Sequence, residues 1–188
     1  MRFVYAAILG FVGFVTSFGA YIVANMFFVS ILFGFVPVYL YSLGYKSEIA
    51  GIFLSVLALS YLLVQPFAGW LADKYEARTT VLWGIAVSAL TIVLIPFAKG
   101  VPLALISIVA GLGIGTVWSN SDAAVSSLAK EGRLGATMGI AGSFKEFGDM
   151  VGPIVIGVLS QAFGLTFGFV ACGLLGLLSL ALMVFRRG

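Results

Sequence analysis

The chain has 188 residues, of which 62% are hydrophobic and 9% are charged, and its mean hydropathy is +1.18. Because soluble domains carry about 25% charged residues, this composition excludes an ordinary soluble protein and indicates an integral membrane protein. The net charge of +3 comes from basic residues scattered over short segments, so it does not indicate nucleic-acid binding. The one cysteine, Cys172, excludes a disulfide framework.

Chain length sets the number of membrane spans. The long apolar segments must be helical, because only helices and closed barrels satisfy their backbone groups in lipid. At about 20 residues per span plus short loops, the chain accommodates six spans, or seven if its first apolar stretch also crosses. The predicted fold class is therefore an all-α polytopic membrane protein.

The N-terminal quarter carries no charge between Phe3 and Tyr45. This stretch is too long for one span and barely long enough for two. Lys46, Ser47 and Glu48 form the first polar loop, with Ser47 as N-cap of the next helix. That second helix is predicted to run to about Leu71.

The segment Gly69–Arg78 concentrates charge between two apolar segments. We interpret it as a tight loop at the membrane face. Gly69 permits two helices to approach closely, and Asp73 marks the end of a helix. Lys74 and Arg78 hold the loop on the cytoplasmic side, where basic residues are enriched.

This segment resembles the loop motif of the major facilitator superfamily (MFS) of transporters, G-x-L-A-D-R/K-x-G-R-R/K. Glu76 stands where the family has glycine, and Ala77 where it has arginine. The matching positions are Gly69, Leu71, Ala72, Asp73, Lys74 and Arg78.

The resemblance implies a six-helix bundle of two three-helix repeats, which is one of the two halves of a family transporter. It covers residues 18–188, and the first helix then spans 18–42. Residues 1–17 remain as an apolar N-terminal extension. A cytoplasmic extension of the first helix, an interfacial helix, a seventh span and a weak signal peptide are the alternatives for it.

Four further helices are predicted after the motif. Gly111, Gly113 and Gly115 give the second of them a surface for close helix packing. The helices are expected at Thr79–Phe97, Val101–Leu128, Leu134–Phe163 and Leu165–Phe185, with a polar loop at Lys130–Arg133.

The basic residues predict an orientation. If the motif is cytoplasmic, only Lys46 and Lys99 lie on the outer side. This asymmetry places both ends of the six-helix core in the cytoplasm of a plasma or inner membrane. The basic residues on the inner side are Lys74, Arg78, Lys130, Arg133, Arg186 and Arg187.

The fifth helix carries Lys145, Glu146 and Asp149 about midway along its length. A charge at the centre of a membrane helix costs about 2.5–3.5 kcal/mol on insertion scales, so these residues must face a cavity or a protein partner. If Lys145 pairs with one acid, the other is a candidate binding site for a proton or a cation. The alternative is a purely structural ion-pair cluster between two subunits.

The glycines of the same helix resemble the antiporter pattern of the family, G-x8-G-x3-G-P-x2-G-G, with Ile156 replacing one glycine. Such glycines permit close helix contact, and the proline permits a bend. The residues concerned are Gly139, Gly148, Gly152, Pro153 and Gly157.

The resemblance also implies an inner gate and a cavity. Asp122 matches an acid that pairs with the loop arginine, here Arg78, while Asp73 meets a helix N-terminus of the other bundle. The alternative for Asp122 is a helix-end acid without a gating role. The first, second, fourth and fifth helices border the cavity, to which Asn25 and Asn120 contribute, while the third and sixth face lipid.

The predicted function is that of a half-size secondary transporter, which moves a small solute or ion by alternating access. A single bundle supplies one wall, so a parallel homodimer or a second half-transporter is the expected partner. The family's fourth-helix arginine is missing, which weakens the case for proton coupling. We expect no enzymatic activity, no cofactor and no metal, since the chain has no histidine and no ATP-binding motif. A non-transporting scaffold or sensor subunit, and a truncated half of a longer transporter, are the alternatives.

Overall fold

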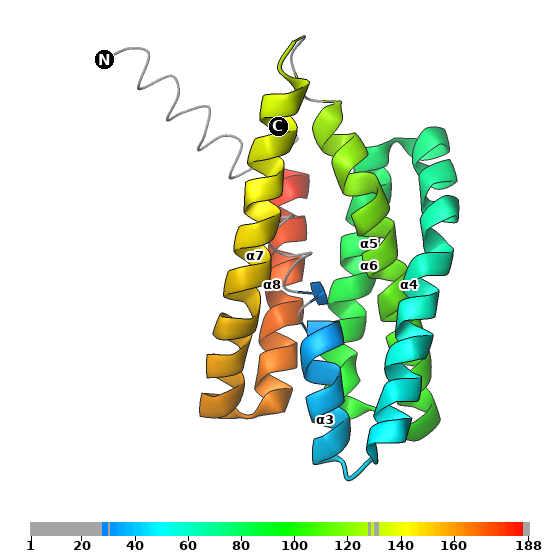
Figure 1. Cartoon of the computed structure of the whole chain (residues 1–188), viewed down its shortest axis with the longest axis vertical. Coiled ribbons are helices and arrows are strands. Elements are labelled where there is room, and N and C mark those ends of the chain that lie inside the picture. The colour runs from blue at the N-terminus through cyan, green and yellow to red at the C-terminus, as the bar shows by residue number, and fades with distance from the viewer. Residues whose placement is uncertain (1–27, 30, 128, 130–131, 186–188) are drawn as a thin grey trace.

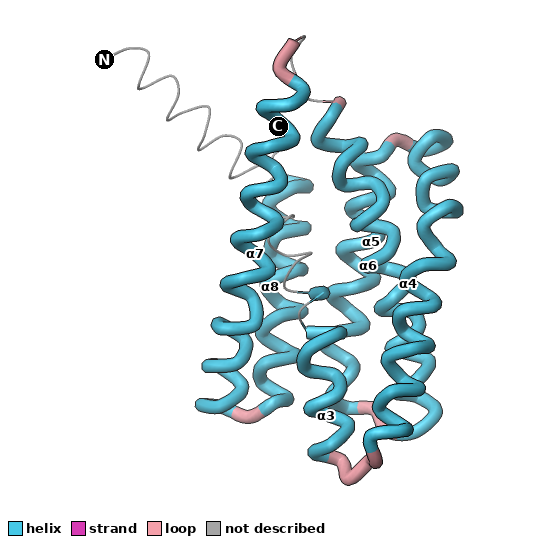
Figure 2. Tube along the Cα trace, in the orientation of Figure 1, coloured by secondary structure: helices cyan, strands magenta, loops and turns pink. Residues whose placement is uncertain are grey.

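The computed structural model describes residues 28–29, 31–127, 129 and 132–185. Every regular element in these ranges is a helix (Figures 1 and 2). With η2 joined to α3 and η3 joined to α5, the described elements form six helical rods. The elements that make up these rods are η2 (Ile31–Phe35), α3 (Val36–Ser42), α4 (Ser47–Tyr75), α5 (Ala77–Leu94), η3 (Ile95–Phe97), α6 (Gly100–Ser126), α7 (Leu134–Phe163) and α8 (Leu165–Phe185).

Some predictions fall outside the described residues. These are the N-terminal extension 1–17, the cavity residue Asn25, and the basic residues Lys130, Arg186 and Arg187.

The predicted loop at Gly69–Arg78 is wrong, because α4 continues through it to Tyr75 and α5 begins at Ala77. Leu71, Ala72 and Lys74 are good helix formers, and the charges lie at a helix end where they reach water. Glu76 alone connects the two helices, with φ of 82°. The segment is therefore a helix terminus with a one-residue hinge.

The connection between α7 and α8 has the same construction. Gly164 alone joins these helices, and its φ is 92°. At both hinges the amide donates to the carbonyl four residues earlier, and the carbonyl accepts from the amide four residues later. The two hinges lie at opposite ends of the bundle (Figure 1). This repeated arrangement agrees with the predicted pair of three-helix repeats.

The interior is built around α6, which packs against α4 and α5, while α5 also packs against α8. The expected glycine surface on α6 is confirmed. A Cβ at Gly111 would lie 2.8 Å from the carbonyl oxygen of Leu57 on α4, and one at Gly113 would lie 2.9 Å from the amide of Ser88 on α5. Larger residues here would force the helices apart.

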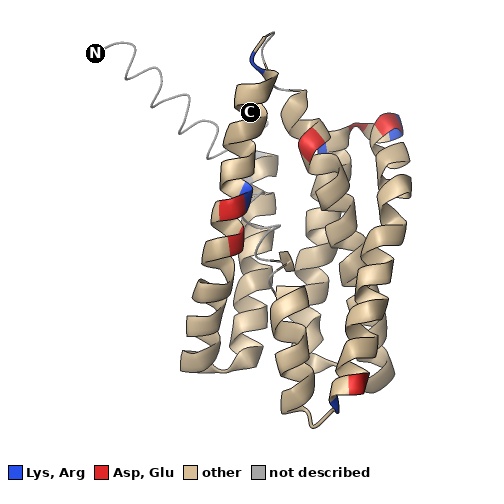
Figure 3. Ribbon diagram, in the orientation of Figure 1, with Lys and Arg blue, Asp and Glu red and all other residues tan. Residues whose placement is uncertain are grey.

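The outer faces are suited to lipid. The exposed side chains of α5 and η3 are all apolar, namely Trp83, Leu90, Leu94 and Phe97. Three described helices, α4, α5 with η3, and α6, are long and apolar enough to cross a bilayer. Charged residues lie near the two ends of the bundle, except on α7, where they also occur partway along the helix (Figure 3). These features are those of a multi-pass membrane protein.

Candidate functional site

The charges on α7 lie well inside the length of the helix. This helix has 30 residues and is about 45 Å long, whereas the hydrocarbon core of a bilayer is about 30 Å thick. Lys145 lies about 17 Å along the helix axis from the first residue, Leu134. Glu146 and Asp149 follow it toward the middle of the helix, where Figure 3 shows acidic residues.

Lys145 does not pair with an acid of its own helix. Its Nζ donates to Oδ1 of Asp122 on α6, at 2.5 Å. The Lys145 side chain is 18% exposed and that of Asp122 is 54% exposed. The pairing of Lys145 with Glu146 or Asp149 that the sequence left open is not formed, because the long lysine side chain reaches across to the neighbouring helix.

Glu146 and Asp149 are both exposed on α7. Within the described part of the chain, neither forms an ion pair. Because they lie three residues apart on a helix, they are neighbours on its surface. The bundle thus presents two uncompensated acids on one face, where the sequence led us to expect one.

An aromatic series extends from Lys145 across three more elements. The Lys145 Nζ lies 5.3 Å from the centroid of the Trp118 ring on α6. Trp118 meets Tyr61 of α4 edge-on at 6.4 Å, and Tyr61 meets Phe33 of η2 at 6.2 Å. Trp118 was not predicted as a site residue, although its position four residues before Asp122 puts both on one face of α6.

The expected pair between Arg78 and Asp122 is not formed. One Arg78 nitrogen, Nη2, instead donates to the carbonyl oxygen of Met183 at 3.1 Å, which ties the start of α5 to the end of α8. Asp122 is occupied by Lys145. The prediction failed because helix rotation, which the sequence does not reveal, decides which cation an acid on α6 can reach.

The other charges of the motif lie at the end of α4. Asp73 is exposed there. The ammonium of Lys74 lies 5.3 Å from the ring centroids of both Trp70 and Tyr75. Lys74 is thus held against aromatic faces at the helix end, where tryptophan, tyrosine and lysine are typical of a membrane interface.

Asn120 does not line a cavity. It is 2% exposed, and its Nδ2 donates to the carbonyl oxygens of Ala68 on α4 at 3.1 Å and of Thr116 at 3.0 Å. Its amide therefore ties α6 to α4 and satisfies a buried polar group, as packing requires. The structure does not support Asn120 as a substrate ligand.

The glycines of the two motifs differ in their surroundings. No heavy atom lies within 4 Å of a Cβ built on Gly69 or on Gly139, so neither glycine mediates the expected close approach inside this bundle. A Cβ on Gly157 would make an ordinary contact with Phe35 at 3.7 Å. Two other members of the antiporter-like pattern, Gly148 and Gly152, are buried in α7. Pro153 is exposed within the helix.

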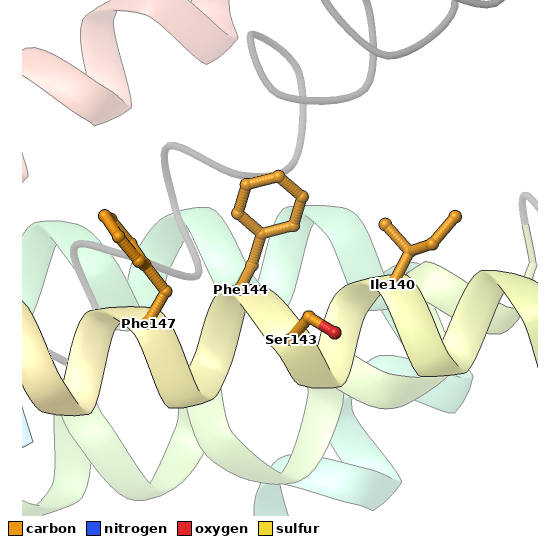
Figure 4. Close-up of a pocket in the computed structure, with 4 residues that line it drawn as sticks. All are labelled: Ile140, Ser143, Phe144 and Phe147. Carbon is orange, nitrogen blue, oxygen red and sulfur yellow. The ribbon is translucent and has the colours of Figure 1, made fainter.

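A cavity of about 400 Å³ borders α7. Its described lining residues are Ile140, Ser143, Phe144 and Phe147, which Figure 4 shows projecting from one side of the helix. The Ser143 hydroxyl donates to the carbonyl of Gly139 in its own helix at 3.1 Å. Helical spacing places this apolar side of α7 away from Lys145 and Asp149, whereas Glu146, three residues after Ser143, is a neighbour of the cavity lining.

Comparison with known proteins identifies relatives. The chain is 29% identical over 177 residues to a multi-drug resistance efflux pump PmrA homolog of Lactococcus lactis, covering 92% of this chain and 43% of that protein. It is 26% identical over 150 residues to the multi-drug resistance efflux pump PmrA of Streptococcus pneumoniae, covering 77% and 37%. The chain thus spans less than half the length of these curated relatives.

The fold also matches a solved structure. A peptide transporter POT in complex with alafosfalin has a TM-score of 0.82 at 21% sequence identity, over 93% of this chain and 38% of that chain. The family profile described as Major Facilitator Superfamily matches residues 9–188. With this match and the six-rod bundle together, the chain belongs to the major facilitator superfamily, a family of transporters and not of enzymes.

Proposed function

We propose that this bundle is one wall of a secondary transporter that moves a small organic solute by alternating access against a second six-helix bundle. The observation that carries the proposal is the pair of exposed acids, Glu146 and Asp149, in the part of α7 that we propose lies within the bilayer. Lipid does not tolerate two such charges, so water or another protein must cover this face. Relatives that are drug efflux pumps support a small organic solute.

The second bundle is best supplied by a parallel copy of this chain. Two copies related by an axis along the membrane normal bring both α7 faces to one central cavity, as the halves of a family transporter do. Four acids, two each of Glu146 and Asp149, then surround the cavity. Each Lys145 is engaged by Asp122 of its own copy, which leaves the four acids to bind protons or a cation.

Chemical crosslinking tests this arrangement. In a Cys172→Ser background, Met150→Cys places a thiol beside the acids, and Leu90→Cys places a matched thiol on the outer face of α5. Both native side chains are well exposed, at 61% and 54%. We expect a short crosslinker in native membranes to join copies through position 150 and not through position 90. Crosslinking at 90 alone, or at neither position, would rule out the proposed interface and leave a different half-transporter as the partner.

We infer that the end of the bundle with the α4–α5 hinge faces the cytoplasm. Lys74, Arg78 and Arg133 lie at this end of their helices, and Lys46 and Lys99 lie at the opposite end. The enrichment of basic residues on the cytoplasmic side supports this orientation.

The same end supplies the proposed inner gate. Asp73 is exposed at the end of α4 and is free to meet a helix N-terminus of the second bundle, where the helix dipole favours an anion. Gly69 and Lys74 flank it on the same helix, and the open space beside Gly69 admits a neighbouring helix. Arg78 supports this gate through its bond to α8.

Removing the Asp73 charge tests the gate. We expect Asp73→Asn to slow the exchange between inward-open and outward-open states while the protein still inserts into the membrane. Accessibility labelling of Met150→Cys from each side, in the Cys172→Ser background, measures this exchange. The gate assignment is wrong if labelling rates in Asp73→Asn equal those of a Glu48→Gln control at the opposite end.

A further inference from the structure

The surroundings of the Lys145 ammonium are those of a bound organic cation. A carboxylate oxygen of Asp122 accepts from it at 2.5 Å, and the ring of Trp118 lies 5.3 Å away. A carboxylate together with an aromatic face is the usual environment in which proteins hold ammonium ligands. Here the occupant is a side chain of the protein itself.

This environment is open to a ligand. The Asp122 side chain is 54% exposed, and Trp118 is half-buried. From Trp118 the aromatic series continues through Tyr61 to Phe33, which is 37% exposed. A molecule with a positive head at Asp122 would therefore have aromatic surface for its apolar body.

Lys145 also has alternative partners on its own helix. Asp149 follows it by four residues, and a lysine and an aspartate at this spacing lie on the same helix face. Neither Asp149 nor Glu146 is ion-paired among the described residues. If a ligand took Asp122, the lysine could turn to Asp149 and no charge would be left unpaired by the exchange.

We propose that Asp122 and Trp118 form a binding site for monovalent organic cations with an aromatic body, and that Lys145 is its resident occupant, which the ligand displaces. This inference names the substrate class of the proposed transporter and rests on it for the route of transport. Binding itself needs neither a gradient nor turnover. The site lies between α6 and α7, two elements that the proposed function places at the cavity.

Equilibrium dialysis of the full chain in lipid nanodiscs tests the site. The probes are radiolabelled benzyltrimethylammonium, which is an aromatic cation, and benzenesulfonate, which is an aromatic anion of similar size. We expect Lys145→Met to tighten binding of the cation about tenfold, the combined worth of a partly exposed ion pair and a cation–π contact. Lys145→Gln, which keeps a polar side chain of similar length, should act in the same direction and serves if the Met variant folds poorly.

Three control variants separate the site from general effects. Asp122→Asn should abolish binding of the cation, and Trp118→Leu should weaken it. Trp83→Leu changes an exposed tryptophan on the outer face of α5 and should leave binding unchanged.

A defined result would overturn the proposal. If both Lys145 variants bind the cation no more tightly than the native chain, the lysine is not a resident competitor and the proposal fails. If they lose benzenesulfonate binding instead, Lys145 is an anion ligand. Dialysis measures binding and does not depend on transport. If the site exists but the chain does not transport, the Lys145 variants still bind the cation more tightly. If the chain transports but lacks this site, they do not.

Discussion

Glu76 has a backbone conformation that is unfavourable for a residue other than glycine. Its φ of 82° lies in the region that side chains with a Cβ avoid, and the family motif has glycine at this position. The loop residue is thus strained where a relative with glycine would be relaxed. Strain of this kind is often kept where a segment must move, and the hinge between α4 and α5 carries the proposed gate.

Replacing Glu76 by glycine should stabilise the protein. Relief of a left-handed conformation is worth about 1–2 kcal/mol, from which the flexibility of glycine in the unfolded chain subtracts about 0.5–1 kcal/mol. We expect Glu76→Gly to raise the thermal unfolding midpoint in detergent by roughly 1–3 °C. Glu76→Ala removes the charge but keeps the strain, and should give no such rise. Equal rises in both variants would assign the effect to charge.

The contacts of single residues were the least predictable part of the site. The sequence drew attention to Lys145, Glu146 and Asp149 because charges within an apolar helix are costly in a membrane. Their partners depend on helix rotation and on the reach of a lysine side chain, neither of which follows from spacing on one helix. Hence neither the pair of Lys145 with Asp122 nor the part of Trp118 in the site was predicted.

At the scale of helices, the bounds of α7 and α8 agree with prediction from the first residue to the last. Arg133 precedes α7 and Gly164 separates it from α8, so these two residues mark the ends of apolar segments long enough to be membrane helices. The end of α4 was misplaced because a run of charges was interpreted as a loop. Charge alone does not end a helix that leaves the membrane, and Glu76 ends it by its backbone conformation.

Gly164 should respond to substitution in the opposite way to Glu76. Its φ of 92° suits glycine, so Gly164→Ala should lower stability by about 1–2 kcal/mol. Gly135, which lies in the first turn of α7 with open space around it, is the matched control. There alanine should be neutral or stabilising, because alanine favours helix. If the two variants have equal thermal unfolding midpoints, the positive φ of Gly164 does not determine stability and the prediction is wrong.

The glycine surface of α6 predicts a second contrast. A Cβ on Gly115 would collide with the carbonyl oxygen of Tyr61 on α4. We expect Gly115→Ala to destabilise the bundle by about 1–3 kcal/mol, as overpacking does. Gly139→Ala on α7 meets nothing within 4 Å and should be tolerated. Fluorescence-detected size-exclusion chromatography after heating compares the two, and equal survival would contradict tight packing of α6 on α4.

At the scale of the whole molecule, the membrane class was predictable from the amount of apolar residues, while the six-helix architecture was implied by the resemblance of the Gly69–Arg78 motif to the transporter family. What covers the acidic face of α7 lies outside the contacts of a single chain, so the second bundle that the sequence led us to expect stays a proposal. The exposed apolar side chains of α5 and α8 are suited to contact with lipid, whereas the charged side chains of Glu146 and Asp149 are not. The face that bears them is where we propose that a second bundle packs.

The most direct test of this account is the pH dependence of solute uptake into proteoliposomes. Uptake of benzyltrimethylammonium and of benzenesulfonate is measured with and without a pH gradient, so that a solute of either charge is detected. We predict gradient-dependent uptake of one probe by the native chain, its loss in Asp149→Asn and in Glu146→Gln, and its retention in Glu48→Gln, which changes an acid at the end of α4. Gradient-dependent uptake that is unchanged in both α7 variants would contradict the account and leave Glu146 and Asp149 with a purely structural role.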